Sequence, residues 1–599
     1  MKKGPIDLTT RRAQSLLKLA ERDPIEAERR FNALPFFEKM AMVLSVRGRD
    51  RERLILLSKE PHRLVERMPE EEFYFTVKEI GEGDSLTLLE LASPRQIAFC
   101  LDLEVWKKNR LRPQDMLRWI ELLMDCGEDK AVEAVRALDQ ELLVTFLQRY
   151  LKVYKPDSPI EEVELDRDDL ITLDRHYYIH IRFRQAEEIL ERFLDMLFRR
   201  DQALYRDLLE GVLWEVPGEI EELARRWRQG RLADRGFPEW EDAMEIYRFV
   251  RPELVSIDKG IKETYGPDDE MKRWGEVGSN FYLLPLPNES FLKEVLEEAS
   301  RQGLDWLKGE LVYLCNRAMV ADSVDPSNLD AVRELLSSVY DYLNLGLSYL
   351  ARGDPREGLR AVRKLYLKEI FQVGFSLTLR LRHRLERIIA KSPWLSGNKR
   401  NLSLLDPPLR EFVGGLLGKK PLLYEGVFDP SGLRYRTFRT LEEIALAEDL
   451  IGYVEAISEL HHRLYGWEPE EVRGIDLKGC HPSSFQDLTF KALTLTALAQ
   501  RERKGEFRFL PLPLSELKPF LQGAFPIKGN RTGEELRKEF IDRVWEFVKG
   551  LSDREPKMAE YIRRFFREAL EDLRNEYGDV DLSAPLDPRF LRLLVLKEA

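Results

Sequence analysis

Cysteine is scarce in this chain. Its 599 residues include four cysteines, Cys100, Cys126, Cys315 and Cys480, and no two of them form a C-x-x-C pair. This number is too small for a disulfide framework, and the spacing excludes zinc fingers, zinc ribbons and clusters held by cysteine. The sequence therefore predicts a protein of a reducing compartment.

Long apolar runs are missing as well. No stretch approaches the roughly 20 apolar residues that a membrane-spanning helix needs. The first residues, MKKGPIDLTTRRAQSLL, include basic side chains but no continuous apolar core and no small-residue cleavage site. We therefore expect no membrane span and a cytoplasmic location.

The chain has no excess of positive charge. Its formal net charge is −12, from 95 basic and 107 acidic residues. Proteins that track nucleic acid usually carry a basic excess, because neutralised phosphates and released counterions drive their affinity. The charge balance argues against a nucleic-acid partner, although it is compatible with a local basic patch.

Common catalytic motifs are absent too. The sequence contains no G-x-S-x-G, no H-E-x-x-H, no kinase set, no EF-hand loop and no strand-linked G-x-G-x-x-G. The stretch VGGLLGKKP, residues 413–421, ends in Gly-Lys but lacks the glycine spacing and the Ser or Thr of a P-loop. We expect no cofactor, and an enzymatic activity is not indicated.

What the sequence does contain is amphipathic helical periodicity along nearly the whole chain. Pro69, Pro94, Pro113 and Asp139 stand where first turns begin, a position that suits proline because its missing N–H had no partner there. Alternate starts, 69 to 113 and 94 to 139, lie 44 and 45 residues apart, which matches a two-helix solenoid unit. Four unrelated helices with common start residues are the alternative.

Helices opened by elements such as SPRQI, residues 93–97, resemble the superhelical N-terminal domain of bacterial magnesium transporters, over about residues 30–155. The membrane part of the transporter has no counterpart in the sequence, so the resemblance implies a fold and no transport activity. The chain as a whole is similar to a bacterial family described only as a domain of unknown function, which implies no activity either.

We predict a mainly α fold, an α-superhelix of helical repeats or bundles, with a small β-hairpin near 163–183. Residues 156–258 contain no lysine, which marks boundaries near Pro156 and Lys259. The predicted modules are a helical-repeat domain at 1–155, a β-hairpin plus helical domain at 156–258, a helical domain at 259–400 and a C-terminal helical domain at 401–599.

The stretch RHYYIHIRF, residues 175–183, alternates apolar and polar side chains and is rich in aromatic and β-branched residues, which indicates a strand. Along a strand His176 and His180 lie roughly 13 Å apart, too far for one metal ion. This face, with Arg182, is either solvated or an anion-binding surface.

A helix pair is expected at YLNLGLSYLARGDPREGLRAV, residues 342–362, which resembles a tetratricopeptide unit through Leu345, Gly346, Tyr349, Gly353 and Asp354. Gly358 replaces the usual Ala, and no proline closes the unit. One degenerate copy implies a helical hairpin and not a peptide-binding array.

Glu459 and His462 form an E-x-x-H, the ligand pair that carboxylate-bridged di-iron bundles use twice. The sequence lacks a second copy, so we predict no metal site. His461 falls on the apolar side of the same helix, where a hydrogen-bonded core histidine is expected.

The most reactive-looking stretch is GCHPSSFQ, residues 479–486. Cys480 and His481 precede an expected helix start with Ser483 and Gln486 as its capping box. A helix dipole lowers a nearby thiol pKa, and a histidine can act as its base. The alternative is a structural turn, since the sequence identifies no third residue to orient the pair.

A basic helix is expected at residues 377–391. Its positive side and the loop that follows hold the candidate anion or nucleic-acid ligands Arg380, Arg384, Arg387, Lys391, Lys399 and Arg400. Leu381, Leu385 and Ile388 mark its buried side.

The leading hypothesis is a helical scaffold or adaptor that binds a protein partner, because helical repeats offer an extended surface. Two alternatives stay open. One is an enzyme with a site near Cys480, His481, His461 and His462 at a module interface. The other is an RNA or anion binder through residues 380–400.

Overall fold

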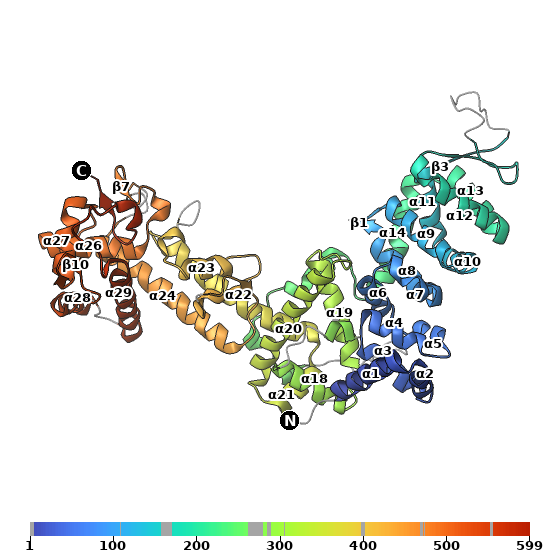
Figure 1. Ribbon diagram of the computed structural model, residues 1–599, viewed down its shortest axis with the longest axis horizontal. Helices are drawn as coiled ribbons and strands as arrows, with labels where there is room; N and C mark the ends of the chain where they lie inside the picture. Colours follow the sequence, from blue (N-terminus) through green and yellow to red (C-terminus); the bar gives the residue numbers. More distant parts are fainter. Residues whose placement is uncertain are drawn as a thin grey trace. The chain divides into compact units, whose positions relative to one another are not determined.

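The computed structural model describes residues 5–107, 109–156, 170–260, 280–283, 289–304, 306–396, 402–429, 431–467, 471, 474–551 and 555–598. These residues are mainly helical, as predicted (Figure 1). The chain divides into two compact units, Met1–Gln372 (unit 1) and Val373–Ala599 (unit 2). The four modules inferred from the sequence stay a prediction, and one of them, 259–400, spans the boundary between the two units.

Unit 1 begins with a succession of short helices. They are α1 (Pro5–Arg22), α2 (Pro24–Asn32), α3 (Phe36–Ser45), α4 (Gly48–Leu56), α5 (Pro61–Glu66), α6 (Glu70–Ile80), α7 (Leu86–Leu91), α8 (Pro94–Glu104), α9 (Pro113–Asp125), α10 (Glu128–Arg136) and α11 (Gln140–Tyr150). A short hairpin of β1 (Trp106–Lys107) and β2 (Arg110–Leu111) joins α8 to α9.

The predicted helix starts are confirmed. Pro69 and Asp139 are the N-cap residues of α6 and α11, and Pro94 and Pro113 are the first residues of α8 and α9. The predicted two-helix unit is wrong, because each period of about 44 residues contains a third, shorter helix, α7 or α10. Neither helix begins with proline, and α7 has only six residues. The pattern of helix-start residues in the sequence therefore does not identify them.

The rest of unit 1 starts with a β ribbon. β3 (Leu151–Tyr154) pairs antiparallel with β4 (Tyr178–Ile181), and Ile171 forms one bridge with Ile179. The strand predicted around His180 is confirmed, but its main partner is β3 and not the segment just before it. Residues 163–169 of the predicted hairpin lie outside the described residues.

Three helices follow, α12 (Glu187–Arg200), α13 (Gln202–Trp214) and α14 (Pro217–Asp234). α14 lies against α11, and α13 against both α11 and β3. After α15 (Trp240–Ala243) and α17 (Asn280–Leu283) come α18 (Phe291–Arg301), α19 (Trp306–Ala321), α20 (Leu329–Ala351) and α21 (Pro355–Lys364).

α20 and α21 form the helical hairpin that the tetratricopeptide-like stretch predicts. Arg352 and Gly353 adopt positive φ between the two helices, and Asp354 caps α21. A Cβ built on Gly358 would lie 2.7 Å from Val295 Cγ2 of α18. Glycine therefore replaces the usual alanine because α18 packs closely onto α21.

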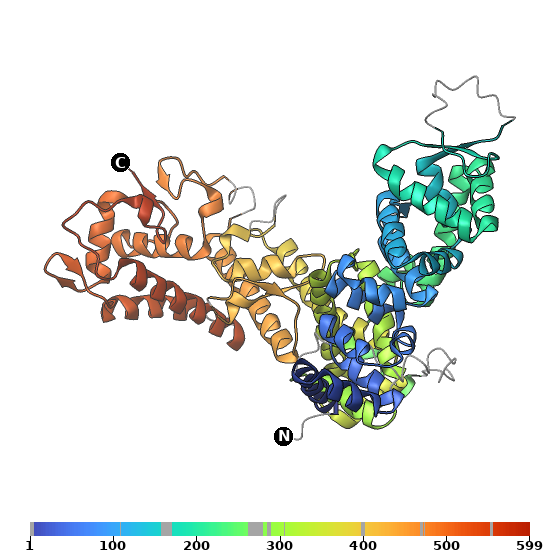
Figure 2. The same ribbon diagram turned by 45° about the vertical axis from the view of Figure 1, so that its right-hand side comes forward.

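Helix α22 (Leu367–Lys391) crosses the boundary between the units, and its C-terminal part belongs to unit 2. Its other helices are α23 (Leu409–Leu416), α24 (Leu441–Tyr465), α26 (Phe490–Lys504), α27 (Leu514–Ala524), α28 (Lys538–Leu551) and α29 (Pro556–Tyr577). The long helices α24 and α29 lie along one another (Figure 2, orange and dark red).

The strands of unit 2 are two residues long. Two hairpins pair β5 (Leu423–Tyr424) with β6 (Tyr435–Arg436) and β9 (Ile527–Lys528) with β10 (Arg531–Thr532). In a third sheet the central strand is β11 (Leu596–Lys597), which pairs antiparallel with β7 (Cys480–His481) and parallel with β8 (Leu512–Pro513). Leu594, Val595 and Leu596 are fully buried.

No helix among the described residues has the length and apolarity that crossing a bilayer requires.

Candidate interaction surface and buried ionic junction

Three consecutive glutamates in the first turn of α6 have three different environments. Glu70 forms a two-bond ion pair with Arg235, each bond 2.8 Å long. Glu72 is fully buried and pairs with Arg51 of α4. Glu71, between them, is also buried, and neither of its carboxyl oxygens has a hydrogen-bond partner.

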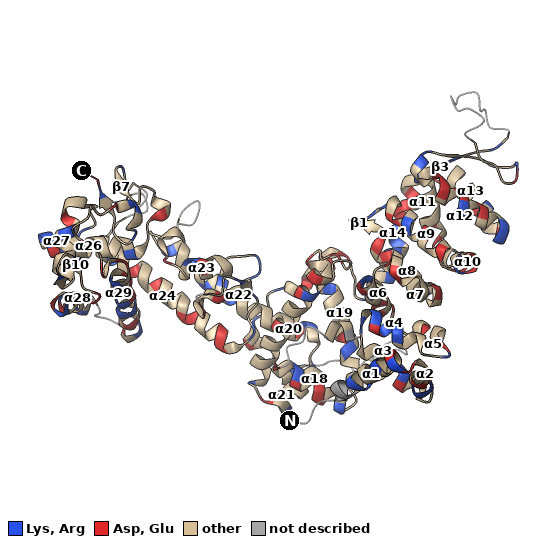
Figure 3. Ribbon diagram, viewed as in Figure 1, with Lys and Arg blue, Asp and Glu red and all other residues tan. Residues whose placement is uncertain are grey.

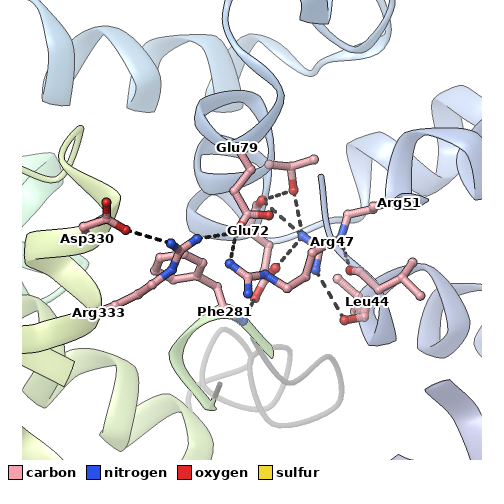
Figure 4. Close-up of polar contacts among 10 residues, drawn as sticks. Leu44, Arg47, Arg51, Glu72, Glu79, Phe281, Asp330 and Arg333 are labelled. Atoms are coloured by element: carbon pink, nitrogen blue, oxygen red, sulfur yellow. Dashed lines mark hydrogen bonds and ion pairs between the residues drawn. The ribbon is translucent and has the colours of Figure 1, made fainter. Parts of the chain in front are cut away.

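The Arg51–Glu72 pair is the centre of a buried polar junction (Figure 4). Arg51 Nη1 donates to Glu72 Oε2 at 2.5 Å and to Thr76 Oγ1 at 2.7 Å. Its remaining donors reach the backbone carbonyls of Val43, Leu44 and Val46. The other Glu72 oxygen accepts the Phe281 N–H at 2.7 Å. The Arg51–Glu72 ion pair and the hydrogen bond from Phe281 therefore connect α4, α6 and α17.

Glu71 differs from its neighbours because nothing compensates its charge directly. Burial raises the pKa of Glu71 to about 8; Arg235 offsets part of this rise, and Glu70 and Glu72 add to it. At neutral pH the carboxyl group is therefore protonated in the folded state, although it would be ionised in an unfolded chain.

Polar contacts extend the junction towards α19 and α20. The Tyr282 hydroxyl donates to Asn316 Oδ1 at 2.5 Å, and the Asn316 amide donates to the Arg235 carbonyl at 2.7 Å. Tyr340 of α20 donates to the Tyr282 carbonyl. These hydrogen bonds join α17, α19 and α20 to the junction.

Large apolar side chains are exposed on α13 and α14 of unit 1. Trp214 is 71% exposed, Trp227 56%, Val216 54% and Leu223 43%. Leu223 and Trp227 lie four residues apart on one side of α14, Val216 is its N-cap residue, and Trp214 ends α13 just before it. We call these four residues the tryptophan face.

The tryptophan face is held in place by polar contacts below it. Trp214 Nε1 donates to Glu210 Oε2 at 2.8 Å, and the Lys155 ammonium lies 5.8 Å from the Trp214 ring centre. Arg149 of α11 pairs with Glu221 of α14 at 2.7 Å. Large aromatic side chains that stay exposed on a rigid support are typical of protein-binding surfaces.

The structure does not bring Cys480 and His481 together as nucleophile and base. They are neighbours on strand β7, so their side chains point to opposite faces. Cys480 is buried, and His481 Nε2 lies 2.9 Å from Glu598 Oε1. The expected helix start is wrong as well: Ser484 caps only a 3-10 turn, and α26 begins after Thr489.

We expect Cys480 to react slowly with thiol reagents in the folded protein, because burial raises its pKa. The measurement is the rate of labelling by a disulfide reagent at pH 7.5, with and without urea, read at Cys480 by peptide mapping. A Cys480→Ser variant serves as the blank. Labelling of folded Cys480 as fast as that of the unfolded chain would restore the nucleophile hypothesis.

The two residues of the E-x-x-H motif have different surroundings. Glu459 pairs with Arg463 of the same helix, and His462 is exposed. Within the described residues no group of three or more His, Cys, Asp or Glu side chains could hold a metal ion.

His461 is the core histidine that the sequence predicts. It is fully buried, with Nδ1 2.8 Å from the Ile457 carbonyl and Nε2 2.9 Å from Thr494 Oγ1. Trp394 and Phe490 lie against its ring. Burial lowers the pKa of His461 to about 4, so it is neutral at physiological pH.

The basic side of α22 is partly neutralised. Arg384 donates to the Glu448 carbonyl at 3.2 Å and lies 3.7 Å from a Glu455 oxygen, while Arg387 donates to the His383 carbonyl. Arg380 and Lys391 are exposed. Figure 3 shows positions of Asp and Glu (red) interspersed with positions of Lys and Arg (blue) along many of the labelled helices. Leu381, Leu385 and Ile388 are buried, as predicted. Lys399 and Arg400 lie outside the described residues.

The sequence predicted a strand face containing His176, His180 and Arg182. His180 is in β4, opposite Lys152, but His176 belongs to the turn before the strand. The Asp174 carboxylate accepts the backbone N–H groups of His176 and Tyr177, which forms that turn. His176 therefore does not continue the strand face.

The functional candidates described here were not identified from the sequence. The sequence predicts a helix start at Pro69, and nothing in the three glutamates that follow it shows that two of them are buried. Trp214 and Trp227 carried a recognisable signal, since two tryptophans flank a helix start at Pro217 in a segment otherwise rich in charge.

Comparison with known proteins gives one match. The chain belongs to the family of unknown function DUF6178, whose model matches residues 28–597. No curated protein and no solved structure matches the chain.

Proposed function

We propose that this DUF6178 protein is a cytoplasmic helical scaffold or adaptor, and that it binds a protein partner through the tryptophan face. The observation that carries the proposal is the exposure of Trp214 and Trp227 on neighbouring helices. Tryptophan is among the residues that contribute most to binding energy at protein interfaces, and on average it is highly buried in folded proteins.

The surroundings of the face indicate what kind of partner fits it. Glu215 and Glu219 are exposed next to Val216, at the start of α14. Arg226, whose side chain is 68% exposed, stands next to Trp227, so both signs of charge surround the apolar patch. Complementary charges speed association and exclude wrong partners. We therefore expect a partner surface with an apolar centre and charged residues of both signs around it.

We expect the double substitution Trp214→Ser/Trp227→Ser to abolish partner binding without unfolding the chain, because both side chains are largely in water. The measurement is affinity purification of the full-length protein from its own cells, with quantitative mass spectrometry of the proteins that co-purify. The matched control is Leu433→Ser/Phe590→Ser, which removes two side chains that are 75% and 78% exposed in unit 2.

A partner retained by the wild type and the control but lost from the tryptophan variant supports the proposal. Identical partner profiles for all three proteins contradict it. Circular dichroism of each variant shows whether the helical content is unchanged.

A further inference from the structure

A shallow pocket of about 290 Å³ lies next to the buried junction. Arg47, Gly48, Glu79, Leu329 and Arg333 line it, so it lies between α4, α6 and α20. Figure 4 shows Arg47 and Arg333 approaching Glu79 from two sides.

Two guanidinium groups share the one carboxylate of Glu79. Arg47 forms an ion pair with it, and Arg333 Nη2 lies 3.5 Å from the same oxygen, Oε1. The Arg47 Nε is buried and has no hydrogen-bond partner. The pocket therefore offers more donors than Glu79 can accept.

Asp330 is the other acid next to the pocket. It lies 3.0 Å from Arg333 Nη1, but its side chain is 90% exposed. Ion pairs this exposed contribute little, because water screens them and the side chains remain mobile. Asp330 therefore offsets the charge of Arg333 only in part.

The backbone adds to the positive potential. Gly48 and Leu329 are the first residues of α4 and α20, so two helix N-termini meet at the pocket. The Asn328 side chain caps the N-terminus of α20, but no side chain caps that of α4. Free N–H groups and the helix dipole both favour negative charge at such an end. Together with the two arginines, they make a site whose chemistry matches a small oxyanion.

We infer that this pocket binds a phosphate group, held between Arg47 and Arg333. Arginine presents its donors in a planar fork that fits phosphate oxygens, and charge-assisted bonds of this kind are the stronger class. The bound group accepts from donors of both arginines that Glu79 does not use, and Glu79 keeps its ion pairs. Because α4 and α20 supply one arginine each, the anion joins these two helices and stabilises unit 1. This inference goes beyond the scaffold function and does not depend on it.

The test is calorimetric titration of the full-length protein with sodium phosphate and, separately, with glycerol phosphate, in chloride buffer of constant ionic strength. We expect saturable binding of at least one of them. Arg333→Gln weakens it by roughly tenfold, the loss expected for one charge-assisted contact. Glu79→Gln strengthens it severalfold, because the substitution removes the negative charge of the carboxylate while retaining the shape of the side chain.

The control is Arg301→Gln, which removes an exposed arginine that pairs with Glu298 on α18, away from the pocket lining. Its binding should equal that of the wild type. Tighter binding of glycerol phosphate identifies a phosphomonoester as the ligand, and equal binding identifies the phosphate group alone.

The inference is overturned if neither compound binds at millimolar concentration, if Arg333→Gln binds as tightly as the wild type, or if Glu79→Gln binds more weakly. The gain expected from Glu79→Gln cannot be produced by a misfolded variant. Partner binding through Trp214 and Trp227 is measured in a separate experiment, so failure of one proposal does not decide the other.

Discussion

Glu71→Gln is expected to stabilise unit 1 by roughly 3 kcal/mol at pH 7, the cost of keeping the Glu71 carboxyl protonated in the fold. Its pKa is about 8 in the folded protein against an ordinary value of 4.5. Between these two values the folded state binds a proton that the unfolded state does not. The stability of unit 1 therefore falls as pH rises from about 4.5 to about 8, and the glutamine variant lacks this part of the pH dependence.

The measurement is hydrogen exchange of peptides from α6 at several pH values between 5 and 9, corrected for the intrinsic exchange rate. Glu70→Gln is the control, because it breaks the pair with Arg235 and should lower protection at every pH above 5. Parallel pH profiles for the wild type and Glu71→Gln would show that the Glu71 proton is not coupled to folding.

The second large effect is expected from Arg51→Met. Removing one partner of a buried ion pair leaves the other charge uncompensated, which typically costs about 3–5 kcal/mol. Glu72 would keep its charge with 0% of its side chain exposed, and three backbone carbonyls would lose their donor. Urea unfolding followed by circular dichroism should show an earlier first transition, which hydrogen exchange assigns to unit 1.

Arg53→Met is the matched control on the same helix. Arg53 is 57% exposed and pairs with Glu21 at 3.3 Å, so its loss should change stability by less than about 0.5 kcal/mol. The double variant Arg51→Met/Glu72→Met should recover part of the loss, because no charge is then left buried. Equal effects of the Arg51 and Arg53 substitutions would mean that the junction does not hold unit 1 together.

The helical architecture could be predicted because its signals are local. Proline at a first turn, the turn at Gly353 and Asp354, and the apolar stripe of Leu381, Leu385 and Ile388 each depend on residues within one or two helical turns. The short helices α7 and α10 were missed since neither has a strong start signal.

The buried junction could not be predicted because it is assembled from distant parts of the chain. Arg51 meets Glu72 across 21 residues, and Phe281 reaches the same carboxylate from 209 residues away. Each of these residues is ordinary in its own stretch of sequence. For Cys480 and His481 the sequence was misleading in the opposite way. Their adjacency suggested a nucleophile and its base, but in strand β7 the two side chains point to opposite faces.

The measurement that tests the central claim most directly is site-specific photo-cross-linking in the protein's own cells. A photoreactive amino acid replaces Leu223, in the middle of the tryptophan face, and in a parallel strain it replaces Phe590 of unit 2, which is more exposed (78% against 43%). We predict a discrete adduct with one protein at position 223 and none of the same mass at position 590. No protein adduct at 223, or the same adducts at both positions, would contradict it.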